Sequence, residues 1–199
     1  MKNNNKIFLG EFIASCFLVM VIVGSGIMAE NLTNDNAIRL LANTIATGAG
    51  LFVLITAFAN ISGAHLNPFV SLSMYLTKRI KGKELLTFIP AQILGCLLGV
   101  MLANVFFEHS IIELSTKNRD GFHIFLSEIV ATFGLIFIIF ATLKDGKTTV
   151  AACVATYISA GYWFTSSTSF ANPAVAIART FTDSFTGINY LNTPTYIFA

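Results

Sequence analysis

Five long apolar stretches follow one another along the chain, separated by short polar segments. They cover residues 7–28, 38–58, 85–107, 122–143 and 148–165. A helix needs about 20 predominantly apolar residues to cross a bilayer. Each stretch is therefore a candidate membrane-spanning helix, and the last, which is rich in small residues, is the weakest of them. The pattern predicts an all-α membrane protein.

Two further apolar segments are too short to span a membrane, and both begin with an Asn-Pro pair. The pairs are Asn67-Pro68 and Asn172-Pro173. Asn caps helix N-termini through its side-chain oxygen, and Pro is favoured at the first helical position. Each pair predicts a short helix that begins where the chain should be leaving the bilayer. Two re-entrant half-helices of this kind, meeting tip to tip, would direct partly positive N-termini at the middle of a pore.

The composition excludes a soluble protein. Of the 199 residues, 55% are hydrophobic and 11% are charged, whereas soluble domains carry about 25% charged residues. The net charge of +2 is too small to indicate nucleic-acid binding. Cys16, Cys96 and Cys153 lie far apart inside apolar stretches, a spacing that suits neither a disulfide framework nor a metal site. We expect no metal and no cofactor.

The basic residues indicate how the chain is oriented in a cell membrane, because cytoplasmic loops carry an excess of Lys and Arg. Three segments fall on one side of the membrane and contain most of these residues: Lys2, Lys6, Lys78, Arg79, Lys81, Lys83, Lys144 and Lys147. The longest loop on the other side has only Lys117 and Arg119. The sequence therefore predicts a multi-pass protein of the plasma or inner membrane with a cytoplasmic N-terminus.

The chain contains an internal repeat. Residues 10–20 resemble residues 126–136, which aligns Glu11 with Glu128, and the first Asn-Pro segment resembles the second. We expect one channel domain over residues 1–199, with a first repeat over 1–107 and an incomplete second repeat over 122–199. An odd number of spans in a repeat inverts the second copy. A sixth span would begin where the chain ends, so we expect five of six spans, and a partial sequence or an inactive product.

Three motifs belong together: ISGAHLNP at residues 61–68, Asn-Pro-Ala at residues 172–174, and the paired early glutamates. Together they resemble the aquaporin and glycerol-facilitator (major intrinsic protein) family, of a bacterial type. The resemblance implies a right-handed helical bundle of six spans and two half-helices, assembled as a homotetramer with one pore in each subunit. It also implies passive conduction of water or small uncharged solutes and exclusion of protons and ions.

The resemblance assigns the pore motifs to Asn67, Pro68 and Phe69 and to Asn172, Pro173 and Ala174. Both asparagine amides are expected to donate hydrogen bonds to passing oxygens, and backbone carbonyls of residues 63–66 and 169–171 to accept them. Phe69 stands where the family usually has Ala, so the contact between the half-helix tips is expected to shift.

Counting from the Asn-Pro motifs places the family's selectivity filter at Thr47, Ala160, Ser169 and Val175. This ring lacks both His and Arg, so we expect a wide filter that admits water together with glycerol-sized polyols or neutral metalloid hydroxides. Arg179 is either a residue of the pore mouth or a helix residue paired with Asp183, four positions further on.

Three residues have two interpretations each. Glu11 and Glu128 are ionisable groups inside spans, where function is the first hypothesis. They are either a proton relay or braces for the loops that precede the half-helices, and the family favours braces. His65 either bonds its own loop or gates the pore by titrating near neutral pH.

Two other functions remain as alternatives. A secondary transporter also uses inverted repeats and broken helices, but the expected midplane groups are neutral asparagines rather than carboxylates. A non-conducting fragment is the other. We do not expect an enzyme, because the spans carry no paired catalytic carboxylates, Ser–His set or metal-ligand cluster.

Overall fold

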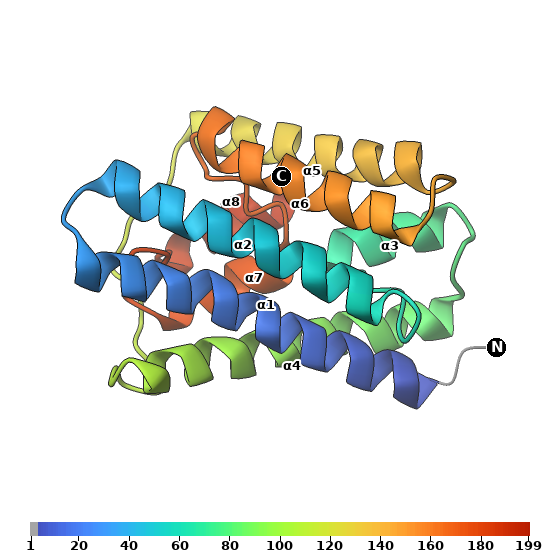
Figure 1. The fold of residues 1–199 in the computed structure, drawn as a ribbon, viewed down its shortest axis with the longest axis horizontal. Coiled ribbons are helices and arrows are strands. Elements are labelled where there is room, and N and C mark those ends of the chain that lie inside the picture. Colours follow the sequence, from blue (N-terminus) through green and yellow to red (C-terminus); the bar gives the residue numbers. More distant parts are fainter. Residues whose placement is uncertain (1–3) are drawn as a thin grey trace.

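The computed structural model describes residues 4–199 as a bundle of long helices that surrounds two short ones (Figure 1). The helices are α1 (Asn4–Leu32), α2 (Asn36–Phe58), α3 (Pro68–Leu76), α4 (Gly82–Phe106), α5 (Phe122–Thr142), α6 (Lys147–Phe164), α7 (Pro173–Ala178) and α8 (Thr193–Phe198). Single 3₁₀ turns cover Arg179–Phe181 and Tyr190–Asn192. All five predicted long helices are present. Lys2, one of the basic residues used for orientation, lies outside the described residues.

Four of the described helices, α1, α2, α4 and α5, are long and apolar enough to cross a membrane. The fifth predicted span forms α6, which is shorter and contains more small and polar residues. Large apolar side chains are exposed on the outer faces of the bundle, among them Leu9, Phe17, Phe133 and Phe137. Such a surface would be a liability in water, and it suits contact with lipid chains.

The tightest helix pair in the bundle is α1 against α4. Gly95 and Gly99 lie one turn apart on α4, and a Cβ atom at either position would collide with the backbone carbonyl oxygen of Phe12 or Cys16 on α1. Small residues at this spacing let two membrane helices approach closely without a side chain between them. The Gly95–Gly99 pair therefore fixes how α4 lies along α1.

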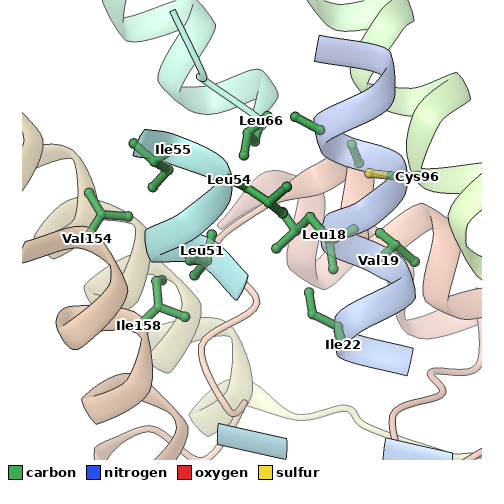
Figure 2. Close-up of a cluster of buried hydrophobic side chains, with 14 of the residues drawn as sticks. Leu18, Val19, Ile22, Leu51, Leu54, Ile55, Leu66, Cys96, Val154 and Ile158 are labelled. Carbon is green, nitrogen blue, oxygen red and sulfur yellow. The ribbon is translucent and has the colours of Figure 1, made fainter. Parts of the chain in front are cut away.

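On the other side of α1, α2 packs between α1 and α6. Figure 2 shows Leu18 and Ile22 of α1, Leu51 and Ile55 of α2, and Val154 and Ile158 of α6 converging from three helices. All six side chains are buried. They form an apolar wall that faces the half-helices.

The order of elements repeats along the chain. Two long helices, α1 and α2, precede the half-helix α3, and two more, α5 and α6, precede the half-helix α7. Both half-helices begin at the Asn-Pro pairs, with Asn67 and Asn172 as extended N-cap residues. The sequence prediction of their starting points is confirmed.

We predict that Gly99→Ala destabilises the bundle by about 1–3 kcal/mol, the usual cost of overpacking a core that cannot relax. The obstacle is the Cys16 carbonyl oxygen, which is part of a rigid helix backbone. Thermal unfolding in detergent measures the effect. Gly24→Ala is the matched control, because a Cβ there meets only Phe107 at 3.5 Å, an ordinary contact. Equal midpoints for the two variants would contradict the packing argument.

Candidate functional site

The two half-helix tips hold each other through a reciprocal pair of hydrogen bonds. Asn67 Nδ2 donates to the carbonyl of Ala171 at 2.6 Å, and Asn172 Nδ2 donates to the carbonyl of Leu66 at 2.7 Å. Each asparagine also caps its own helix, because Asn67 Oδ1 accepts from Phe69 N at 2.9 Å and Asn172 Oδ1 accepts from Ala174 N at 3.1 Å. An amide group has two N–H bonds, so one remains for the cavity on each side.

The backbone before each asparagine is strained in the same way. Ala64 and Leu66 have φ values of 51° and 52°, and Ser169 and Ala171 have 50° and 45°. This left-handed region disfavours residues with a Cβ, and such strain persists only where the surroundings enforce it. The unusual backbone leaves N–H groups inside the protein that no helix can satisfy.

Glu11 satisfies the N–H groups of the first strained loop. Its Oε1 accepts from Ser62 Oγ at 2.6 Å and His65 N at 3.1 Å, and its Oε2 accepts from Leu66 N at 2.8 Å. Gln92 Nε2 of α4 donates to the same Oε2 at 2.8 Å. The side chain is fully buried, so these donors take the place of water around its charge.

Glu128 does the same for the second strained loop. Its Oε1 accepts from Phe170 N at 3.0 Å and its Oε2 from Ala171 N at 2.8 Å. Neither Glu11 nor Glu128 is among the residues that line the cavity described below. This geometry supports bracing, because a relay carboxylate would have to reach the solute path.

His65 lies in the first strained loop and lines the cavity. Its Nδ1 is 3.0 Å from Ser71 Oγ, and its ring stacks on Phe88 at a centroid distance of 4.2 Å. Gln92 Nε2 also donates to Ser71 Oγ at 2.9 Å, which links this network to Glu11. The sequence analysis missed Gln92 and Ser71. A polar residue in the middle of an apolar span was the available signal for Gln92.

One cavity of about 560 Å³ passes the half-helix tips. One side of it is the apolar wall of Figure 2, and the other is formed by the two strained loops with Asn67 and Asn172. Lys147, the first residue of α6, and Tyr162, fifteen residues later, both line it. At 1.5 Å per residue these two side chains are about 22 Å apart along the helix. The cavity therefore extends through most of the bundle.

The two ends of the cavity differ in their side chains. We call the end that contains Arg79, Lys144 and Lys147 the lysine mouth, and the end that contains Thr47, Tyr162 and Arg179 the Arg179 mouth. Between them the polar groups come from the asparagines and the loop backbones. The lumen thus offers hydrogen-bond donors and acceptors along one side only, a pattern suited to small polar molecules in single file.

Three of the four predicted filter residues, Thr47, Ser169 and Val175, line the cavity. Ala160 does not, because it lies on the exposed face of α6. Tyr162 occupies the cavity side instead, and its hydroxyl donates to Thr47 Oγ1 at 3.2 Å. An error of two residues rotates a helix position by about 200°, which places Ala160 on the wrong face. The structure therefore contradicts the expectation that Ala160 lines the cavity, and Tyr162 lies there instead.

Arg179 is buried and lines the cavity near Val175. Its Nε donates to the carbonyl of Thr186, and its guanidinium carbon lies 3.5 Å from the centre of the Phe170 ring. The alternative that Arg179 pairs with Asp183 is wrong, since Asp183 Oδ1 accepts from Thr116 N at 2.8 Å instead. The α-helix ends at Ala178, so the two residues never share a helical face.

The remaining residues of the two Asn-Pro motifs lie in the first turns of the half-helices. Pro68 and Pro173 are the first residues of α3 and α7. Ala174 is buried at the tip contact, whereas Phe69 is half-buried and does not line the cavity. Despite Phe69, the reciprocal asparagine bonds hold the two tips together.

Comparisons with known proteins place this cavity in a known context. The model of the Major intrinsic protein family matches residues 1–199. The chain is 46% identical over 191 residues to Aquaglyceroporin AqpS of Rhizobium meliloti, covering 96% of this chain and 82% of that protein. It is 36% identical over 149 residues to Aquaporin TIP1-2 of Musa acuminata, and 28% identical over 187 residues to Aquaporin-4 of Rattus norvegicus.

The extent of these matches differs. The Musa and Rattus alignments cover 71% and 92% of this chain but only 58% and 54% of the relatives. The chain thus spans little more than half the length of those two proteins. The X-ray structure of the aquaglyceroporin from Plasmodium falciparum matches with a TM-score of 0.75 at 20% identity, covering 87% of this chain and 78% of that one. At this identity the likeness establishes the fold.

We predict that Glu128→Gln lowers the free energy of unfolding by about 2 kcal/mol, the scale of a hydrogen bond to a charged group. A glutamine nitrogen would face a backbone N–H where the carboxylate now accepts from Phe170 and Ala171. Hydrogen exchange at these two amides should also become faster. Glu108→Gln is the control, because Glu108 is exposed and its side chain makes no hydrogen bond within residues 4–199. Unchanged exchange at Phe170 and Ala171 would remove Glu128 from the bracing role.

Proposed function

The chain belongs to the major intrinsic protein family and has the aquaporin-like fold, and from this premise we propose that it is a passive channel for water and small uncharged solutes. The chemistry required is recognition by hydrogen bonds followed by release, not bond making, and the residues of the cavity suit that task. The relatives named above are aquaporins and an aquaglyceroporin, which supports a channel rather than an enzyme.

The reciprocal asparagine pair is the observation that carries this proposal. It brings Asn67 and Asn172, which are 105 positions apart, to the same point of one cavity. The remaining N–H of each amide can donate to the oxygen of a passing molecule. A water that accepts from both asparagines has its own hydrogens directed toward the two mouths. The chain of hydrogen bonds along which a proton could move is then interrupted at the tips.

Cations are excluded by the same region. The N-termini of α3 and α7 meet at the tips and direct partial positive charge into the lumen. The described part of the cavity is lined by no Asp or Glu. A coupled transporter would need a carboxylate or an ion site on the solute path, so the channel is the better supported function.

The filter sets the range of solutes. Val175 leaves the position of the family's arginine without charge, and Thr47, Ser169 and Tyr162 add hydroxyl groups around it. Tyr162 makes this ring smaller than Ala160 would have made it. The positive charge at this mouth belongs to Arg179 rather than to Val175, and the hydroxyl groups beside it support passage of glycerol-sized polyols, or of neutral metalloid hydroxides, in addition to water.

The arrangement in the membrane follows from the repeats and the basic residues. We place the N-terminus and the lysine mouth in the cytoplasm, and the Arg179 mouth outside, by the excess of Lys and Arg near α3 and between α5 and α6. The two repeats, 1–107 and 122–199, then lie inverted in a plasma or inner membrane. By likeness to the family, four copies would assemble as a homotetramer with one pore each.

Stopped-flow light scattering of proteoliposomes tests the proposal by comparing water, glycerol and arsenite. We expect all three to pass faster than through protein-free vesicles. In Val175→Arg, glycerol and arsenite permeability should fall by about tenfold or more, since 1.4 kcal/mol of added barrier is a factor of ten. Water should be affected less because it is smaller.

Val175→Met is the matched control, because it adds bulk at the same position without charge or hydrogen-bond donors. It should reduce glycerol permeability less than Val175→Arg does. Wild-type protein that passes water while excluding both glycerol and arsenite would refute the wide filter. An unchanged solute range in Val175→Arg would show that Val175 does not belong to it.

A further inference from the structure

Arg179 is a buried cation that forms no ion pair among residues 4–199. Arg179 is only 3% exposed, and among its side-chain nitrogens only Nε donates to a described residue, to the carbonyl of Thr186. Phe170 covers one face of the guanidinium. Within residues 4–199 no carboxylate forms an ion pair with Arg179, and neither of its terminal nitrogens has a protein acceptor.

Glu128 is packed against the same loop and attracts Arg179 electrostatically, but among residues 4–199 it forms no ion pair with Arg179. Its two oxygens accept from Phe170 N and Ala171 N, on the side of the loop away from the cavity. Arg179 therefore lines the cavity with terminal nitrogens that have no acceptor among the described residues. Burying an unpaired charge is costly, so a ligand that supplies the missing acceptors would be bound favourably here.

The charge of the whole cavity points to the kind of ligand. Arg179 lines one mouth and Arg79, Lys144 and Lys147 line the other, whereas the described lining includes no Asp or Glu. The side chains of Arg79 and Lys144 have no hydrogen-bonded partner among residues 4–199, and Arg79 lies over the Phe140 ring at 5.6 Å. A small anion thus meets favourable potential at both ends of the path, and a cation meets none.

The geometry at the Arg179 mouth adds shape to this charge. With Nε engaged, the edge formed by the two terminal nitrogens remains, and this edge matches two oxygens of one carboxylate. Hydroxyl groups of Thr47, Tyr162 and Ser169 lie around the same mouth. Ser169 is buried, and its Oγ has no hydrogen-bond partner within the described chain. Because Ser169 Oγ is shielded from the cavity, the hydroxyl groups of Thr47 and Tyr162 are the further polar groups for the rest of a small hydroxylated molecule.

We propose that the Arg179 mouth binds a small hydroxycarboxylate through two charge-assisted hydrogen bonds, and binds it more tightly than a neutral polyol. This inference rests on the proposed channel function. A neutral diol accepts hydrogen bonds from the two terminal N–H groups of the arginine but carries no charge. A carboxylate accepts the same two hydrogen bonds and also supplies a negative charge. An anion held at this mouth lies in the path of neutral solutes and slows their passage.

The test is glycerol influx into proteoliposomes with equal lactate inside and outside, compared with equal chloride. Equal concentrations on both sides remove osmotic differences and let lactate reach the Arg179 mouth whichever way the channel is inserted. The chloride comparison keeps ionic screening constant. We expect lactate to slow glycerol influx through the wild type. In Arg179→Gln the concentration of lactate required should rise by about tenfold, as expected when a charge-assisted pair of hydrogen bonds is lost.

Two further variants separate binding from general effects. Arg119→Gln removes a neighbouring arginine that lies 6.0 Å from the Phe170 ring but donates to the carbonyls of Phe185 and Gly187 and does not line the cavity. It should remain sensitive to lactate. Arg179→Lys keeps the positive charge but lacks the paired terminal N–H groups of the guanidinium, so its sensitivity to lactate should be intermediate.

A second measurement does not depend on conduction. Lactate should raise the thermal midpoint of detergent-purified wild type and of Arg119→Gln, but not of Arg179→Gln, because a ligand stabilises only the folded state that binds it. If the wild type shows no glycerol influx but lactate still raises its thermal midpoint, the channel function is refuted and the subsite is supported. Glycerol influx that lactate slows equally in Arg179→Gln and wild type, or no effect of lactate on either measurement, would overturn the subsite.

Discussion

The structure depends on one constraint, which is that backbone polar groups at membrane depth must be satisfied inside the protein. Each half of the chain breaks its helical pattern to bring an Asn-Pro pair into the middle of the bundle. The loops that do so contain residues with positive φ and N–H groups outside any helix. Glu11 and Glu128 accept these N–H groups, and without such acceptors a loop of this kind could not persist there.

This solution separates two kinds of charge. The anions lie behind the loops and contact their N–H groups, so the opposite side of each loop presents carbonyl groups and asparagine amides to the cavity. The cations lie in the cavity itself, Arg179 at one mouth and Arg79, Lys144 and Lys147 at the other. Because Glu11 and Glu128 hold the loops, their carboxylates do not lie in the cavity beside its cations. A positive, carboxylate-free path is a consequence of how the loops are held.

The sequence correctly predicted features that local chemistry determines. Its predictions failed where the outcome depends on which face of a helix meets the cavity or on where a helix ends. Asn67 and Asn172 were found because an N-cap followed by Pro leaves few alternatives, and the early glutamates because charge inside an apolar span is conspicuous. Ala160 was expected to line the cavity where Tyr162 lies, because counting along α6 does not fix which face meets the cavity. The Asp183 partner of Arg179 was wrong because α7 ends at Ala178, an end that no Gly or Pro marks in the sequence.

Structural and selective roles coincide at the centre of the cavity and separate at its mouth. Asn67 and Asn172 each contribute one N–H to hold the opposite loop and one to the lumen, so any change there alters both the fold and the solute path. The side chains of Val175 and Arg179 take no part in the two hydrogen bonds between the tips. Substitutions at the mouth can therefore change which solutes are bound while the braced loops and the tip contact stay intact, and in a fold built this way the mouth is where selectivity is free to vary.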